Sequence, residues 1–434
     1  MDFYFRFKRT DLLLLATVFY AFFALAFEAV AELVFGISVL FLIFLVLKDR
    51  HFSIKKPPFY FLAFAILIAM SSWAFMLIQQ PEIADSSPRV ESLANKFLFI
   101  PIALILAGSV PKTFLLWGAL GLSALLMPWL AGNGLDDVKD ALMGQRTGFG
   151  RHPITMGMIY AVALIGALVF SRRIIGSRLL SWRFLLWGFL MLVLLFAVWA
   201  SQTRAIYLAL AVLVVLGLST LLFFAYQRGG SFVRIFWLFT LSVSLLVVLS
   251  VVLFRLGYFD SIARKILDES GVIQSLINGD LAAIPKNSFG LRIHFWVDAW
   301  NMGLDRFWVG WGEGGNHYLH EKAGNFFGDR HFVTVHNDLL ELFLAYGLPG
   351  VLLFVALIFW LTREVFRLFL ARQMPLDFLI FYILFMVFYV VNGLFMSVLY
   401  FDESLLLWNV ILSGYLGFVF KYQSFQNWMM TDVE

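Results

Sequence analysis

His336 lies at the boundary between a long polar segment and the strongly apolar run that follows it. His336 lies in the sequence Thr-Val-His-Asn-Asp-Leu-Leu-Glu, just before an apolar run. Asp338 followed three residues later by Glu341 is a capping-box pattern, which predicts a helix that begins at about Asp338. The positive end of such a helix disfavours an imidazolium and favours bound anions. The pattern indicates a neutral, proton-accepting His336 beside a phosphate, whereas this segment taken alone is also compatible with a solvated loop histidine.

Arg204 is the first of two arginines that are candidates to bind that phosphate. It opens an apolar run in the sequence Ser-Gln-Thr-Arg-Ala, after Ser201 and Thr203, which are possible helix caps. A guanidinium fork matches a phosphate bidentately, and a helix N-terminus adds to the attraction for anions. The alternative is an arginine that only anchors the helix at the membrane interface.

Arg292 is the second candidate, and it falls in a helix predicted from 291 to 303. Helical spacing places Arg292 on one face with Phe295, Trp296 and Ala299. Its alternative role is a solvated charge on a helix surface. If the function is phosphate binding, Arg292 and Trp296 would both face the ligand.

The glycine-rich run 311–315 follows this helix. It lacks the Gly-Lys-Ser/Thr ending of a P-loop and the strand-helix setting of a dinucleotide fold. We interpret it as a tight turn or a close backbone approach to ligand, which makes Gly312 and Gly314 candidate substrate-binding residues.

A metal site is the competing interpretation of the next segment. His317 and His320 are three residues apart, Glu313 and Glu321 flank them, and His331 is nearby. Such a pair can grip zinc if the segment is helical, but it has no fixed third ligand and more often marks a polar surface. We therefore expect no metal.

Composition restricts the class of protein. The chain has 434 residues, of which 62% are hydrophobic and 14% charged, and it has no cysteine. So much apolar surface does not fit inside a soluble domain, so the expected fold is an all-α polytopic membrane protein. Disulfides and thiol catalysis are excluded. We expect no cofactor and no nucleic-acid partner.

Apolar runs of roughly 20 residues mark membrane-spanning helices. Twelve are predicted: 12–27, 30–47, 59–78, 97–110, 113–131, 154–170, 184–200, 205–226, 235–254, 339–361, 378–399 and 405–420. The first resembles a signal peptide but is expected to stay uncleaved, because many spans follow it.

The loops between these spans predict the orientation. Lys and Arg gather on one set of short loops, which are therefore expected in the cytoplasm together with both termini. The chain then divides into nine spans over 1–254, a mainly helical outer loop domain over 255–337, and three spans with a short tail over 338–434. Residues 258–277 are expected to form an amphipathic helix at the membrane surface.

Four further polar residues are weaker candidates for a functional or structural role. His152, Asp402 and Glu403 fall in outer loops and are candidates to orient His336 or to touch substrate. Asn392 lies inside the eleventh predicted span and is expected to bond across helices.

These motifs together resemble the bacterial O-antigen ligase and O-antigen polymerase superfamily. The resemblance rests on the Ser-Gln-Thr-Arg-Ala sequence around Arg204, on Leu291-Arg292 with Trp296 and the run 308–315, and on Val335-His336-Asn337 leading to Glu341 and Gly347. The topology, about twelve spans with one large late loop, agrees over most of the chain.

The resemblance implies a metal-independent, inverting glycosyltransferase at the periplasmic face of the bacterial inner membrane. Its donor would be a glycan on undecaprenyl pyrophosphate, and a ligase would pass the glycan to a sugar hydroxyl of lipid A-core. By position, Arg204 and Arg292 would hold the pyrophosphate and His336 would take the acceptor's proton. Asn337, Trp296, Gly312 and Gly314 would complete the substrate site.

Three other functions remain open at this point. A polymerase would use the same chemistry to extend a second lipid-linked chain, and the motifs do not separate it from a ligase. A protein-glycosylating relative is less expected, because little sequence follows the last span. A transporter of lipid-linked sugars would show paired halves and ionisable groups at mid-membrane, whereas the charges here gather at the outer interface.

Overall fold

The structure is a computed structural model that describes residues 2–48, 57–176, 181–227, 270–315 and 334–431. Within these ranges every regular element is a helix. The helices are α1 (Asp2–Phe23), α2 (Glu28–Lys48), α3 (Pro57–Gln79), α4 (Val90–Ala94), the 3₁₀-helix η1 (Asn95–Phe97), α5 (Phe99–Leu106), α6 (Val110–Leu130), α7 (Leu135–Leu142), α8 (Pro153–Val169), α9 (Ser171–Ile175), α10 (Trp182–Ser201), α11 (Arg204–Gln227), α14 (Ser288–Asp305), α16 (Asp338–Leu370), α17 (Leu376–Gly393) and α18 (Asp402–Thr431). The all-α prediction is confirmed.

Seven of the described helices are long and apolar enough to cross a membrane. They are α2, α3, α6, α10, α16, α17 and the part of α18 up to Tyr422. Shorter apolar helices lie in α1, α8 and the first part of α11. The chain is therefore a multi-pass membrane protein. The ninth predicted span, 235–254, and residues 258–269 of the predicted surface helix lie outside the described residues, whereas 270–277 are helical.

The fourth predicted span, 97–110, is not a single long helix. Only Phe99–Leu106 forms α5, about 12 Å of helix, which is too short to cross a bilayer. Ala107 and Gly108 both take left-handed backbone conformations that turn the chain into α6. The apolar run in the sequence concealed this reversal, because Ala107 is an ordinary helix former.

Helix α18 forms the centre of the bundle. Its apolar stretch is almost fully buried, and α5 packs along it. Two side chains of α18 hydrogen-bond to backbone groups at the start of α5 or just before it. The Asn409 side-chain amide accepts from Phe99 N–H at 2.9 Å and donates to Asn95 O at 2.9 Å. Trp408, fully buried, donates from its indole nitrogen to Lys96 O at 3.0 Å.

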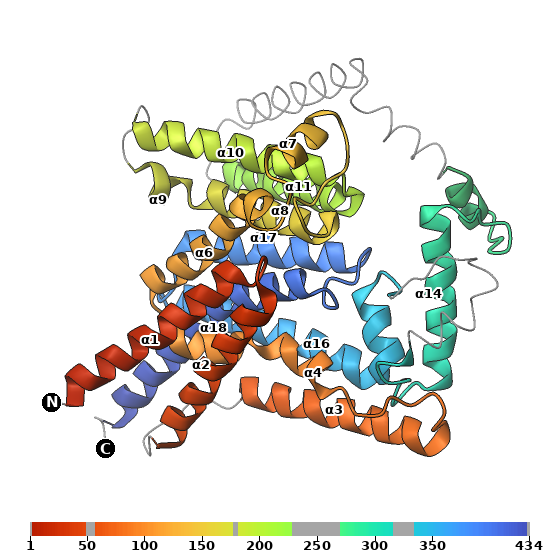
Figure 1. The fold of residues 1–434 in the computed structure, drawn as a ribbon, viewed down its shortest axis with the longest axis horizontal. Coiled ribbons are helices and arrows are strands. Elements are labelled where there is room, and N and C mark those ends of the chain that lie inside the picture. The colour runs from red at the N-terminus through yellow and green to blue at the C-terminus, as the bar shows by residue number, and fades with distance from the viewer. Residues whose placement is uncertain (1, 49–56, 177–180, 228–269, 316–333, 432–434) are drawn as a thin grey trace.

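Figure 1 shows how the remaining helices are grouped. α6, α8, α10, α11 and α17 lie together as one layered group, with α1 and α2 beside it, and α3 lies at the bottom of the view below α4 and α16. α14 stands apart at the right, steeply inclined to that group, and packs against the N-terminal part of α16. The start of α1 and the end of α18 lie on the same side of this view.

Helix α16 is broken in its N-terminal part. Gly347 has φ 65° and ψ −163°, which is not helical, and Pro349 follows it. The break frees carbonyl groups, and other segments satisfy them: Leu344 O accepts from Trp311 N–H at 2.8 Å, and Ala345 O accepts from Gly312 N–H at 2.9 Å. A broken helix is tolerated at membrane depth only where the protein supplies such partners.

The break depends on a glycine. A Cβ at Gly347 would lie 2.6 Å from Phe307 O, in a backbone conformation that L side chains rarely adopt. We expect Gly347→Ala to destabilise the fold by more than about 1 kcal/mol and to lower the Tm in detergent. Gly36→Ala in α2 is the matched control, because a Cβ there meets nothing within 4 Å. Equal midpoints for the two variants would show that the break is not strained.

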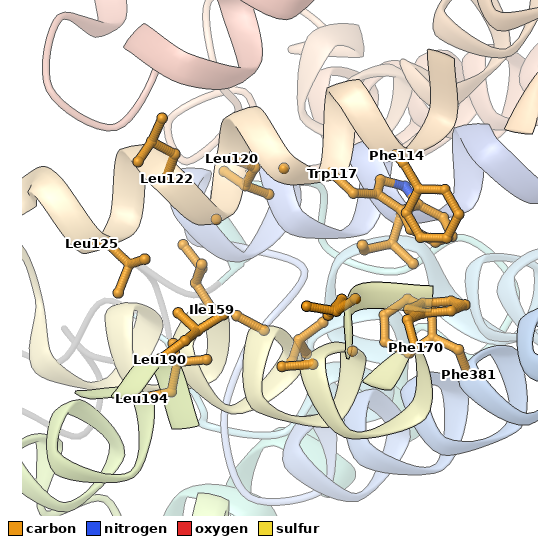
Figure 2. A pocket seen from close by; sticks show the side chains of 18 of the residues that line it. Phe114, Trp117, Leu120, Leu122, Leu125, Ile159, Phe170, Leu190, Leu194 and Phe381 are labelled. Atoms are coloured by element: carbon orange, nitrogen blue, oxygen red, sulfur yellow. The ribbon is translucent and has the colours of Figure 1, made fainter. Parts of the chain in front are cut away.

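An apolar cavity of about 660 Å³ opens between α6, α8 and α10 (Figure 2). Phe114, Trp117 and Leu125 of α6 face Ile159 and Leu194 across it. Arg173 also lines it and is ion-paired with Asp377, with Nη2 and Oδ1 2.9 Å apart. None of the predicted site residues lines this cavity, so it is separate from the candidate site.

Candidate active site

His336 lies just before the N-terminus of α16, as the sequence predicts. It has a positive φ of 57°, a left-handed conformation that few non-glycine residues adopt. Its side chain is half-buried, and its Nδ1 lies 3.4 Å from the Thr334 hydroxyl. Thr334 and Val335, which precede it, are buried. The imidazole therefore projects from a backbone segment that is itself embedded in the protein.

The cap of this helix is Asn337 and not the predicted Asp338–Glu341 capping box. The Asn337 side-chain oxygen accepts from Leu339 N–H at 3.0 Å and from Leu340 N–H at 3.1 Å. Its amide nitrogen donates to Leu394 O at 3.1 Å. The start of the helix at Asp338 is confirmed, but the pattern alone did not reveal that the residue before it was the better cap. The binding of substrate by Asn337 stays a prediction.

The two acidic residues of the predicted box bond to other segments. Asp338 Oδ1 accepts from Leu399 N–H at 3.0 Å, and Glu341 Oε1 accepts from Val335 N–H at 2.6 Å. Glu341 also accepts from the Ser397 hydroxyl at 2.7 Å. The segment after α17 is thus bonded to Asp338 and Glu341, which both follow His336.

Trp296 reaches the His336 turn from α14. Its indole nitrogen donates to Val335 O at 2.8 Å, and its ring lies 6.3 Å from that of Phe395. The predicted helix over 291–303 is confirmed and is longer, beginning at Ser288. Arg292 lies one turn before Trp296 on the same helix, so the two residues share one helix face.

Arg204 is the first residue of α11, as predicted, but the expected caps act differently. The Ser201 hydroxyl donates to Val198 O at 2.8 Å and the Thr203 hydroxyl donates to Ser201 O at 3.1 Å. Ser201 thus bonds within the last turn of α10, and Thr203 bonds back to the end of α10. Within the described part of the chain, neither caps α11.

Arg146 is a neighbour of Arg204 that the sequence analysis missed. Its Nε donates to Ser201 O at 3.0 Å, in the turn that leads to Arg204. Its Nη2 lies 3.4 Å from the Thr203 hydroxyl, next to Arg204 in the sequence, and burial and then the charge of Arg204 lower the pKa of the Arg146 guanidinium. The sequence contained no signal for this pair, because 58 positions separate the two residues and Arg146 lies in an ordinary polar loop.

His152 and Glu403 lie in the same region. The His152 ring stacks on Phe401, with centroids 5.8 Å apart, and Arg151 Nη1 lies 3.9 Å from Glu403 Oε1. Burial and then the charge of Arg146 lower the pKa of His152, while the charge of Glu403 opposes that shift. That either His152 or Glu403 orients His336 stays a prediction, and so does a role for Asp402.

Asn392 does not bond across helices as expected. Its amide nitrogen donates to Phe388 O at 2.8 Å, within α17. Its buried side-chain oxygen accepts no hydrogen bond from the described residues. The prediction was wrong because the carbonyl one turn earlier is always within reach of a helical asparagine.

The structure connects the helices that carry the three candidate residues. α14 packs against α16, and α11 packs against α17. α17 ends at Gly393, from which the chain continues into the segment that bonds Asn337, Asp338 and Glu341. That the side chains of Arg204, Arg292 and His336 face one shared site stays a prediction.

The glycine-rich run approaches α16. The Gly312 N–H donates to Ala345 O and to the Ser72 hydroxyl, the latter at 3.0 Å, so this N–H is engaged within the protein. Gly310, with φ 65°, lies so close that a Cβ on it would be 2.5 Å from the backbone of Ala345. The glycines thus allow a close backbone approach to the broken helix. Ligand binding by Gly312 and Gly314 stays a prediction.

Lys96 is a second residue whose place the sequence did not reveal. Its buried ammonium donates to Ser92 O and lines a small cavity of about 30 Å³ together with Glu313, Asp338 and Glu341. Burial lowers the pKa of Lys96, while the surrounding carboxylates oppose that shift. The cavity has room for about one water molecule.

The predicted metal residues His317, His320, Glu321 and His331 lie outside the described residues. Among the residues that the structure describes, no cluster of three or more His or acidic side chains has the geometry to hold a metal ion.

Comparison with known families adds an independent observation. Residues 189–355 match the family model described as O-antigen ligase. Over this segment the chain is similar to O-antigen ligases. The matched segment contains Arg204, Arg292 and His336, the three residues on which the resemblance of the sequence rests. No curated protein matches the chain.

Proposed function

We propose that this protein is an O-antigen ligase of the bacterial inner membrane. It would transfer a glycan from undecaprenyl pyrophosphate to a sugar hydroxyl of lipid A-core, at the periplasmic face, during lipopolysaccharide assembly. The observation that carries the proposal is the placement of His336, half-exposed on a buried turn at the N-terminus of α16, inside the segment that matches the family. Both termini would be cytoplasmic and residues 255–337 would form the outer loop domain.

The proposed reaction is a single inverting displacement. The acceptor hydroxyl oxygen attacks the anomeric carbon, the bond from that carbon to the pyrophosphate oxygen breaks, and the hydroxyl proton passes to His336. Negative charge grows on the leaving pyrophosphate, and Arg204 and Arg292 would stabilise it without a metal ion. Arg146, beside Arg204, would add a third cation to this region. An imidazole suits the proton transfer because it ordinarily titrates near neutral pH.

A polymerase would carry out the same chemistry on a different acceptor. We therefore propose a test in which the purified protein and an undecaprenyl-pyrophosphate-linked glycan are incubated separately with lipid A-core and with a second lipid-linked glycan. A ligase forms a product only with lipid A-core, and mass spectrometry of the lipid products shows which acceptor was used. Elongation of the lipid-linked chain, with no lipid A-core product, would replace the ligase by a polymerase.

A transporter of lipid-linked sugars is the candidate from another class, and the broken helix α16 is the observation in its favour. However, the carbonyls freed at the break accept hydrogen bonds from Trp311, Gly312 and Ser72, so they are already engaged and are poor ligands for an ion or sugar. A transporter is expected to tolerate loss of His336 better than loss of Asn392, and an enzyme is expected to show the reverse. Measuring both variants separates the two classes.

A further inference from the structure

The peptide unit before His336 is held from both sides. The Val335 N–H donates to Glu341 Oε1 at 2.6 Å, and the Val335 carbonyl accepts from the Trp296 indole at 2.8 Å. Val335 itself is fully buried. The backbone that leads into His336 is therefore fixed in position and in rotation.

Glu341 connects this turn to a second segment. The oxygen that accepts from Val335 also accepts from the Ser397 hydroxyl at 2.7 Å, and Ser397 lies in the chain between α17 and α18. Glu341 and Ser397 are both buried, so water does not replace either bond cheaply. One carboxylate oxygen thus joins three parts of the fold: the His336 turn, α16 and the segment that follows α17.

His336 needs such support. A non-glycine residue with φ near 57° is held in a sparsely populated conformation, which persists only where the surroundings enforce it. A left-handed residue that loses its restraints relaxes, and its side chain then points in another direction. The position of the imidazole thus depends on the bonds to its neighbours.

We propose that Glu341 is a positioning residue for His336, holding the imidazole toward the reacting hydroxyl by fixing the Val335 peptide to the Ser397 segment. The inference rests on the proposed function of His336 as the base. Glu341 does not touch substrate in this account, and its carboxylate acts only as a hydrogen-bond acceptor.

Two variants of Glu341 test whether the position needs only a hydrogen-bond acceptor. Glu341→Gln keeps a carbonyl oxygen that can accept from Val335 and Ser397, whereas Glu341→Ala removes the acceptor. We expect Glu341→Ala to lower kcat about 100-fold, as misplacement of a catalytic group by about 1 Å does, with little change in the KM for the lipid-linked donor. Glu341→Gln is expected to keep a kcat close to that of the wild type.

Glu364→Ala is the matched control. Glu364 is also buried in α16, but it lies toward the opposite end of the helix and pairs with Arg367, with 3.0 Å between the charged atoms. It should leave kcat unchanged. If Glu341→Ala does not fold, Ser397→Ala removes one of the two bonds at nearly constant volume and is expected to lower kcat by a smaller factor.

The outcomes are distinct. A wild-type kcat in folded Glu341→Ala, an equal loss in Glu364→Ala, or a loss in Glu341→Gln as large as in Glu341→Ala would each overturn the positioning role. His336→Ala is measured in the same series. If that variant turned over at the wild-type rate, the proposed function itself would fail, whatever Glu341 does.

Discussion

Replacing His336 by alanine is expected to lower the kcat for glycan transfer by about 100-fold to 10,000-fold, the range that a positioned general base contributes. The donor is bound by cations elsewhere in this account, so its KM should change little. The loss would appear in kcat and in kcat/KM alike, as it does when an interaction made only in the transition state is removed. Steady-state rates with varied donor concentration measure both parameters.

The control for this prediction is His294→Ala. His294 lies on α14, and its Nε2 is 3.3 Å from Ile284 O, in the segment that precedes the helix. It should keep the wild-type kcat. A His336→Ala enzyme with undiminished kcat would remove the base from the mechanism, and an equal loss in His294→Ala would point to a general effect of disturbing this region.

Loss of Arg204 is expected to lower transfer by about 100-fold to 1000-fold, because the guanidinium would stabilise charge that develops on the leaving pyrophosphate. Arg292→Ala should have an effect in the same range. Arg204→Lys keeps the charge but loses the planar fork, so its loss should be intermediate. The measured quantity is kcat/KM for each variant.

The double variant tests whether the two arginines share one ligand. If both bind the same pyrophosphate, Arg204→Ala with Arg292→Ala should deviate from the product of the two single effects, because contacts to one group are coupled. Arg367→Ala, at the far end of α16, is the control for simple loss of a positive charge. Two single effects that multiply without coupling would place the arginines at separate sites.

The parts of the fold that the sequence predicted well are those set by local rules. The N-terminus of α16 at Asp338 and the helix around Arg292 followed from periodicity and from polar-to-apolar boundaries, and both are confirmed. Arg204 at the start of α11 followed in the same way. The class of protein followed from composition alone.

The errors arose where distant segments decide the outcome. The choice of Asn337 over Asp338 as the helix cap depends on Leu394 and Leu399, which bond to these side chains from another part of the chain. The partnership of Glu341 with Ser397 has the same origin. No local pattern encodes such bonds.

A second kind of error came from taking the length of an apolar run as evidence that it crosses the membrane. The run 97–110 is long enough to suggest a span, but left-handed residues at Ala107 and Gly108 divide it. The sequence did not predict the left-handed conformation of Ala107, because alanine ordinarily favours a helix.

Glycan transfer by this protein is expected to require His336 and no metal ion. The most direct test incubates purified protein with undecaprenyl-pyrophosphate-linked glycan and lipid A-core, in detergent with excess chelator, and follows the lipid A-core product for the wild type and His336→Ala. We predict that the wild type forms product at its full rate despite the chelator and that His336→Ala forms almost none. Equal product from both proteins, or no product from the wild type until a divalent metal is restored, would contradict the account.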